Sequence, residues 1–176
     1  TSEGMFFETI NAACVMQVPM AVTVYDDGFG ISVPVELQTT KSSISKALGG
    51  FEKHGKETGC LIYQCRGWDY PNLVRIFEEG IHECREKHVP VLFHIDELTQ
   101  PTGHSSSGSQ ERYKDSARLE WEKEFDALSK FREYILSSGK ADLESILYIE
   151  KKAEKRARLA RDNAWKNYLG SFELEI

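Results

Sequence analysis

The sequence predicts an α/β protein built on a parallel sheet, and three observations support this fold class. Short apolar, partly β-branched runs recur at residues 20–25, 60–65 and 90–95. Segments with the apolar spacing of helices precede the first run and separate the last two. Runs that are apolar throughout are typical of strands buried on both faces, and their alternation with helices is typical of parallel crossover connections.

An acidic loop follows the first predicted strand. Residues 4–17 are expected to form an amphipathic helix, and the strand at residues 20–25 runs directly into Asp26, Asp27 and Gly28. Open α/β sheets bind ligands at the carboxyl ends of their strands, so the two acids are candidate binding residues. The alternative, which is the commoner meaning of an Asp-Gly pair, is a tight turn.

The middle of the chain carries a hydroxyl-rich run, a second strand and a helix. Residues 39–43 could bind phosphate or a monovalent cation, but capping of a short helix at residues 44–48 is the simpler interpretation. The strand at residues 60–65 leads to a helix for which Pro71 suits the first turn. The residues predicted to pack this helix on the sheet are Val74, Phe77, Ile81 and Cys84.

The segment after the third strand has no apolar anchor between residues 100 and 109, so we expect it to be mobile. Its histidine, His104, is most simply an exposed linker residue. However, this segment also leaves the carboxyl end of a strand. If the sheet is parallel, His104 lies at the same edge as Asp26 and Asp27 and can reach whatever the acids hold.

Beyond residue 116 the pattern is helical. A second helix is expected to start near Asp142 and to include a charged run at residues 150–158. That run is expected to be a solvated helix face, with a docking patch as the alternative. The first helix is expected to be continuous up to Gly139, with one apolar stripe made of Trp121, Phe125, Leu128, Phe131 and Ile135.

Composition excludes several classes of function. The 176 residues are 40% hydrophobic and 28% charged, with a net charge of −6, which argues against nucleic acid or anionic membrane as a partner. No apolar run approaches the roughly 20 residues that span a bilayer, and no secretory signal is recognisable. The four cysteines form no Cys-x-x-Cys pair, so we expect buried, reduced thiols rather than disulfides or zinc ligands. Because Thr1 leads directly into a helix, we expect a chain cut in the middle of a fold.

The acidic loop and the histidine loop together suit one kind of ligand. Two carboxylates favour a hard divalent cation, and Mg²⁺ bound in this way usually holds a phosphorylated ligand as well. Gly28 and Gly30 allow the backbone to approach such a ligand, and the loop of His104 could close over it. The sequence contains no Ser-His-Asp order, zinc-ligand spacing or Walker glycine loop.

Two stretches of the chain resemble the alpha part of the thiamine-dependent 2-oxo acid dehydrogenases, the decarboxylating first components of the pyruvate and branched-chain complexes. Within residues 1–34, Asp26-Asp27-Gly28-Phe29-Gly30-Ile31-Ser32 stands where that family closes its thiamine diphosphate motif with Asn-Asn-Gly-Tyr-Ala-Ile-Ser. Gly103-His104-Ser105-Ser106-Ser107 resembles the family's Gly-His-Ser-(Thr/Met)-Ser loop. The resemblance covers roughly residues 1–140.

This resemblance implies site residues. Asp27 is expected to bind Mg²⁺ through its side chain, and Phe29 through its backbone carbonyl. Gly30 and Ile31 are expected to lie along thiamine diphosphate. His104 matches the active-site histidine near the phosphates and the reaction centre.

The resemblance also implies domains and partners. Residues 1–115 would be the C-terminal half of the cofactor-binding α/β domain, and residues 116–176 the C-terminal helices. The whole enzyme would decarboxylate a 2-oxo acid on thiamine diphosphate and transfer the acyl group to lipoamide. Its partners would be a beta part, separate or fused, and a lipoyl acyltransferase component, in a dimer of alpha–beta units. We expect a cytoplasmic protein of bacterial type, inactive as an isolated fragment.

Departures from the family pattern leave an alternative open. Both asparagines are acids here, and Tyr25 and Gln100 stand where arginines occur in the family. The glycine–acid–glycine that opens the motif is absent from the 176 residues. The alternative is a non-catalytic scaffold or assembly module that keeps the fold without the cofactor. The Gly-His-Ser-Ser-Ser loop argues against a transketolase-type enzyme, and Ser105 matches a serine that a kinase phosphorylates in the animal enzymes.

Overall fold

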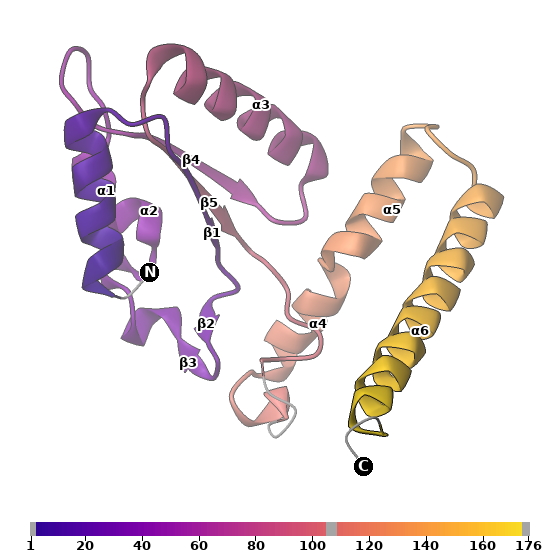
Figure 1. The fold of residues 1–176 in the computed structure, drawn as a ribbon. Helices are drawn as coiled ribbons and strands as arrows, with labels where there is room; N and C mark the ends of the chain where they lie inside the picture. The colour runs from indigo at the N-terminus through magenta and orange to yellow at the C-terminus, as the bar shows by residue number, and fades with distance from the viewer. Residues whose placement is uncertain (1–2, 105–108, 174–176) are drawn as a thin grey trace. The chain divides into compact units, whose positions relative to one another are not determined.

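The computed structural model describes residues 3–104 and 109–173 (Figure 1). The chain forms two compact units, Thr1–Phe131 and Arg132–Ile176. The domain boundary between residues 115 and 116, which the family resemblance implies, stays a prediction. In chain order the elements are α1 (Gly4–Met16), β1 (Ala21–Tyr25), β2 (Phe29–Gly30), β3 (Val33–Pro34), η1 (Val35–Leu37), η2 (Thr40–Ser42), α2 (Ile44–Ala47), η3 (Gly49–Phe51), β4 (Leu61–Arg66), α3 (Tyr70–Lys87), β5 (Val91–Asp96), η4 (Gln110–Arg112), α4 (Ser116–Glu124), α5 (Ala127–Ser137) and α6 (Leu143–Glu173).

The first unit contains a three-stranded parallel sheet in the order β1–β5–β4, which confirms the predicted fold class. In the register of the strands, Ile95 of β5 lies between Tyr25 of β1 and Cys65 of β4. All three strands therefore end at the same edge of the sheet. The loops that follow β1 and β5 leave from neighbouring positions on that edge (Figure 1).

Two apolar clusters cover the two faces of β5, whose first five residues are all buried. Successive residues of a strand point to opposite faces, so Leu92 joins one cluster and Phe93 the other. The cluster of Leu92 also contains Ile10, Cys14, Ile44, Leu48 and Cys60. The cluster of Phe93 also contains Cys65, Ile76, Cys84, Val91 and Ile95. A central strand buried in this way explains why residues 90–95 are apolar apart from His94.

Helix α3 packs on the sheet as predicted, and three of the four residues named for this contact, Phe77, Ile81 and Cys84, pack with the cluster of Phe93. Its buried residues are Ile76, Gly80 and Cys84, whereas Val74 is 38% exposed. Phe77 and Ile81 pack at the margin of the cluster. The prediction was wrong for Val74, and it omitted Ile76 and Gly80, of which Gly80 has no side chain to mark the helix face. In place of a side chain, Gly80 receives the ring of Phe93 from β5.

The hydroxyl-rich run and the cysteines behave as expected. The side chain of Ser43 accepts a hydrogen bond from the backbone N–H of Lys46 and caps α2, which confirms the capping interpretation. Each of the four cysteines is free and buried. The expectation of buried, reduced thiols is therefore confirmed.

The prediction of one continuous helix from Trp121 to Ile135 is wrong. Helix α4 ends at Glu124 and α5 begins at Ala127. Asp126 accounts for the break, because its carboxylate accepts hydrogen bonds from the backbone N–H and the hydroxyl of Ser129 and so starts a new helix. The rings of Trp121 and Phe125 still stack, with their centroids 5.4 Å apart.

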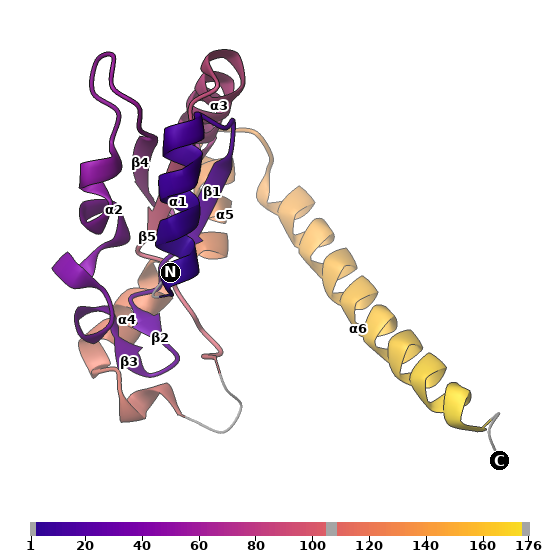
Figure 2. The ribbon, with the colours of Figure 1, turned by 60° about the vertical axis from the view of Figure 1, so that its left-hand side comes forward.

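The second unit contains α6, a single uninterrupted helix of 31 residues (Figure 2). Asp142 begins it by accepting the backbone N–H of Ser145 at 2.8 Å. Arg132 and Glu150 form an ion pair of 3.5 Å within this unit. The side chains of the charged run at residues 150–158 are exposed, as expected of a solvated helix face. None of the described helices combines the length and the apolar character that a membrane span requires.

Candidate functional site

The acidic loop is a sharp bend at the end of β1. The backbone N–H of Asp26 donates to the carbonyl of Ile95 at 2.8 Å and so continues the pairing of β1 with β5. The carboxylate of Asp26 then accepts the backbone N–H of Gly28 at 2.8 Å. Gly28 has a φ of +80°, which favours glycine. The antiparallel pair of β2 and β3 starts only at Phe29, so Asp27 does not lie in a hairpin turn.

Asp26 points into the protein and is fully engaged there. Its Oδ2 lies 3.0 Å from Nε2 of His94, which is 1% exposed. The other ring nitrogen of His94 lies 2.9 Å from the hydroxyl of Ser45. The hydrogen bond from His94 holds the pKa of the Asp26 carboxyl below its usual range. Asp26 therefore links the loop to β5 directly and to α2 through His94, and both of its oxygens already have hydrogen-bond partners.

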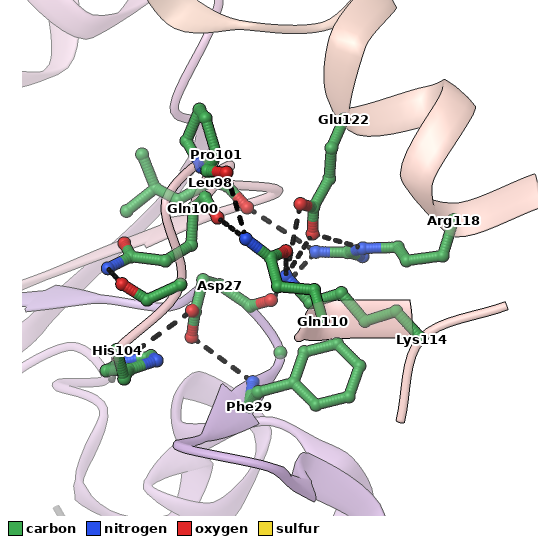
Figure 3. A network of polar contacts seen from close by, with 12 residues as sticks. Asp27, Phe29, Leu98, Gln100, Pro101, His104, Gln110, Lys114, Arg118 and Glu122 are labelled. Atoms are coloured by element: carbon green, nitrogen blue, oxygen red, sulfur yellow. Dashed lines mark hydrogen bonds and ion pairs between the residues drawn. The ribbon is translucent and has the colours of Figure 1, made fainter. Parts of the chain in front are cut away.

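Asp27 points to the sheet edge and retains an unpaired oxygen. Its Oδ1 accepts the backbone N–H of Phe29 at 3.2 Å. Its Oδ2 is buried and has no hydrogen-bond partner. Nε2 of the His104 imidazole lies 3.9 Å from this oxygen (Figure 3). A buried carboxylate oxygen without a donor is unfavourable, so this atom fits the inner coordination of a cation.

The loop after β5 brings His104 to this position. Gln100, which replaces an arginine of the family pattern, donates its amide to the carbonyl of Gly103 at 3.1 Å. Gln110 donates to the carbonyls of Gln100 at 2.7 Å and Pro101 at 3.0 Å, and so braces the same loop from behind. The structure thus brings together Asp27 and His104, which are far apart in the sequence. Ser105 lies outside the described residues, as do the others from 105 to 108 for which mobility was expected.

The other residues predicted to bind the cofactor, Phe29, Gly30 and Ile31, do not all line the same cavity. A cavity of about 860 Å³ runs along β1 and is lined by Asp27, Phe29 and Gly30 among others. The side chain of Gln38 lies where a Cβ on Gly30 would be, so the close approach that this glycine allows is used by the chain itself. Ile31 is 62% exposed, has a φ of +60° and does not line the cavity.

Sequence reasoning missed a buried ion-pair network on α4 and the turn before it. Lys114 and Glu122, 5% and 4% exposed, form an ion pair of 2.8 Å. Arg118 also pairs with Glu122 at 2.8 Å and donates to the backbone carbonyl of Asp27 at 2.8 Å (Figure 3). The spacing of Arg118 and Glu122 by four residues predicts a helical pair. Nothing in that spacing indicates that the pair is buried against the acidic loop.

Among the described residues, no group of three or more His, Cys, Asp or Glu side chains is placed to hold a metal. A cation at Asp27 would therefore need backbone oxygens, water or a ligand's own oxygens. Mg²⁺ is commonly bound with few protein carboxylates in this way.

Comparison with known proteins identifies the family. The family model described as "Dehydrogenase E1 component" matches residues 1–168. The chain is 30% identical over 145 residues to the mitochondrial 2-oxoisovalerate dehydrogenase subunit alpha 2 of Arabidopsis thaliana, an alignment that covers 79% of this chain and 28% of that protein. The chain therefore spans little more than a quarter of the length of that relative. The match over nearly the whole chain shows that it belongs to the dehydrogenase E1 component family.

Proposed function

We propose that this chain is the part of a 2-oxo acid dehydrogenase that holds the Mg²⁺ ion of thiamine diphosphate. The family match supports the class of enzyme. The proposed metal site rests on one observation: Oδ2 of Asp27 is buried, has no hydrogen-bond donor and lies 3.9 Å from Nε2 of His104. A divalent cation would satisfy this oxygen, and an imidazole beside it could contact the oxygens of a diphosphate.

Each residue has a separate role in this proposal. Asp27 binds the metal through its carboxylate, and Phe29 through its backbone carbonyl. Gly30 and Ile31 lie along the cofactor, and His104 donates to the phosphates or to the reacting substrate. Thiamine diphosphate, when bound, supplies the nucleophilic carbon and the electron sink for decarboxylation. The chain's own residues supply position and charge.

The proposal extends to the partners that such chemistry requires. A beta part, separate or fused, completes the cofactor site, and a lipoyl acyltransferase component accepts the acyl group. The assembly is a dimer of alpha–beta units in the cytoplasm, acting on a 2-oxo acid. The Arabidopsis relative is a 2-oxoisovalerate dehydrogenase subunit, which supports this substrate class.

The test is the binding of Mg²⁺ and thiamine diphosphate to the full-length protein with its beta part, measured by isothermal titration calorimetry. Asp27→Ala is expected to weaken Mg²⁺-dependent binding by more than about tenfold, equivalent to about 1.4 kcal/mol. Asp27→Asn keeps a side-chain oxygen and restores the family's amide, so it should retain most of the affinity. The matched control is Asp162→Ala, which removes an exposed acid of α6 and should leave binding unchanged.

A second function, the non-catalytic scaffold, is favoured by one observation. The side chain of Gln38 fills the space beside Gly30 that a cofactor could use. A scaffold predicts that the wild-type assembly forms without binding thiamine diphosphate at any Mg²⁺ concentration. Unchanged affinity in Asp27→Ala, with binding in the wild type, would instead assign the metal to other residues.

A further inference from the structure

One side chain of α4 contacts the backbones of both loops of the candidate site. The guanidinium of Arg118 donates from one nitrogen to the carbonyl of Asp27 at 2.8 Å and to the carbonyl of Leu98 at 3.5 Å. Asp27 belongs to the loop after β1, and Leu98 to the loop after β5 that leads to His104. Arg118 thereby bridges two segments that are separated by about seventy residues of sequence.

The guanidinium of Arg118 also belongs to a network of buried charges. Its Nε donates to Oε1 of Glu122 at 2.8 Å, and Glu122 also receives Nζ of Lys114 at 2.8 and 3.0 Å. Lys114 donates in addition to Oε1 of Gln110 at 2.9 Å, and Gln110 braces the histidine loop through the carbonyls of Gln100 and Pro101. Removing one member of such a network leaves a buried charge without its partner, so the network opposes displacement of the guanidinium.

Aromatic rings restrict the same guanidinium from two further sides. The Arg118 guanidinium lies 4.6 Å from the ring centroid of Trp121 and 5.6 Å from that of Phe29. The ammonium of Lys114 lies 5.1 Å from the same Phe29 ring. Phe29 is the residue whose carbonyl is proposed as a metal ligand. The cations of this network therefore contact the loop at two points next to that carbonyl, the backbone of Asp27 and the ring of Phe29.

We propose that Arg118 is a positioning residue of the metal site: it sets the distance between the acidic loop and the histidine loop, so that Asp27 and His104 face one ligand. This inference rests on the proposed function. A binding group held to within a fraction of an ångström has high affinity, and a loosened one does not. Lysine cannot replace Arg118 fully, because its ammonium is a point donor without the planar fork.

The experiment titrates Mn²⁺, as a paramagnetic substitute for Mg²⁺, into the full-length protein with its beta part and thiamine diphosphate, and measures free Mn²⁺ by electron paramagnetic resonance. Arg118→Met removes every donor while keeping much of the apolar stem, and should weaken Mn²⁺ binding by about 10- to 100-fold, the usual range for partners that orient metal ligands. Arg118→Lys should give a smaller loss.

Two further arms separate positioning from general damage to the fold. Arg75→Met is the matched control: Arg75 also pairs with an acid four residues along its helix, but it is 63% exposed and touches neither loop. It should leave Mn²⁺ affinity unchanged. Added methylguanidinium, at concentrations that leave the wild-type unfolding midpoint unchanged, should restore part of the Mn²⁺ affinity of Arg118→Met.

The outcomes distinguish the two proposals. If the wild type binds Mn²⁺ and Asp27→Ala weakens it, while Arg118→Met binds normally, the positioning role is wrong and the proposed function stands. Weakened binding in Arg118→Met that equals the effect of Arg75→Met would also overturn the inference. If Arg118→Met does not fold, normal Mn²⁺ affinity in Arg118→Lys counts against it. Absence of Mn²⁺ binding in the wild type would overturn the proposed function itself.

Discussion

Adjacent residues of an extended chain point in opposite directions, and the end of β1 shows the consequence for two identical acids. The side chain of Asp26 points into the protein, where one oxygen contacts His94 and the other accepts the backbone N–H of Gly28. Asp27 turns to the rim and keeps one oxygen without a donor. The sequence predicted that the pair marks the site. The residue pattern alone could not predict which acid is free, because His94 comes from another strand; only the family resemblance singled out Asp27.

The first prediction concerns the pH dependence of stability. The pKa of Asp26 in the folded protein lies below its usual range because His94 hydrogen-bonds the carboxylate. The ionised group therefore stabilises the fold above its unfolded-state pKa of about 3.9, and this contribution is lost as the pH falls through the lower folded-state pKa. We expect urea unfolding to show a fall in stability below about pH 4 that is shallower in Asp26→Asn.

The control for this prediction is Asp162→Asn. Asp162 is an exposed acid of α6 that pairs with its neighbour Arg161, and its replacement should leave the acid limb of the stability curve unchanged. Identical acid limbs in the wild type and in Asp26→Asn would show that the contact with His94 does not stabilise the ionised form.

At the scale of elements, the strands were predictable and the helix faces less so. A buried parallel strand is marked by its own apolar run, which is why β1, β4 and β5 fall within one residue of their expected starts and ends. A helix face is marked only by its large residues. The line of α3 that approaches the sheet passes through Gly80, and the break between α4 and α5 depends on one capping side chain, Asp126.

Gly80 gives the second prediction. In an exposed helix interior, replacing glycine with alanine stabilises by about 1 kcal/mol. Here a Cβ would lie 2.6 Å from Cζ of Phe93, whose ring stacks with those of Phe77 and Tyr63. Overpacking a core in this way costs about 1–3 kcal/mol. We therefore expect Gly80→Ala to lower the free energy of unfolding by about 1–2 kcal/mol in chemical denaturation.

The control lies in the same unit. A Cβ on Gly50 would meet no atom within 4 Å, so Gly50→Ala should be neutral or stabilise by up to about 1 kcal/mol. Should Gly80→Ala prove as stable as Gly50→Ala, α3 must be able to move away from β5 without loss, and the close contact would not be a constraint on the fold.

At the scale of the whole molecule, the sequence indicated where the site lies but not what supports it. The edge of the candidate site follows from strand direction, and the proximity of Asp27 and His104 follows from two strands being neighbours. The support comes from Lys114, Arg118 and Glu122, which in sequence belong to a charged helical stretch of the kind usually found on a solvated surface. Their burial results from tertiary packing, which no local pattern encodes.

The cysteines provide a prediction about the first unit as a whole. Cys14 and Cys60 belong to the cluster on one face of the sheet, and Cys65 and Cys84 to the cluster on the other. Burial raises the pKa of each of these thiols, that of Cys60 to about 12. Because the thiolate is the reactive form, all four should react slowly with iodoacetamide at neutral pH in the native protein.

The measurement is alkylation across a urea series, with the four cysteine-containing peptides quantified by mass spectrometry. If both faces of the sheet open in one cooperative step, the four sites should become reactive together, with a common midpoint that matches unfolding followed by circular dichroism. Early labelling of Cys14 and Cys60 alone would mean that the face covered by α1 and α2 opens separately. In that case Asp26, which His94 and Ser45 fasten to the same face, would lose its support before the rest of the sheet unfolds.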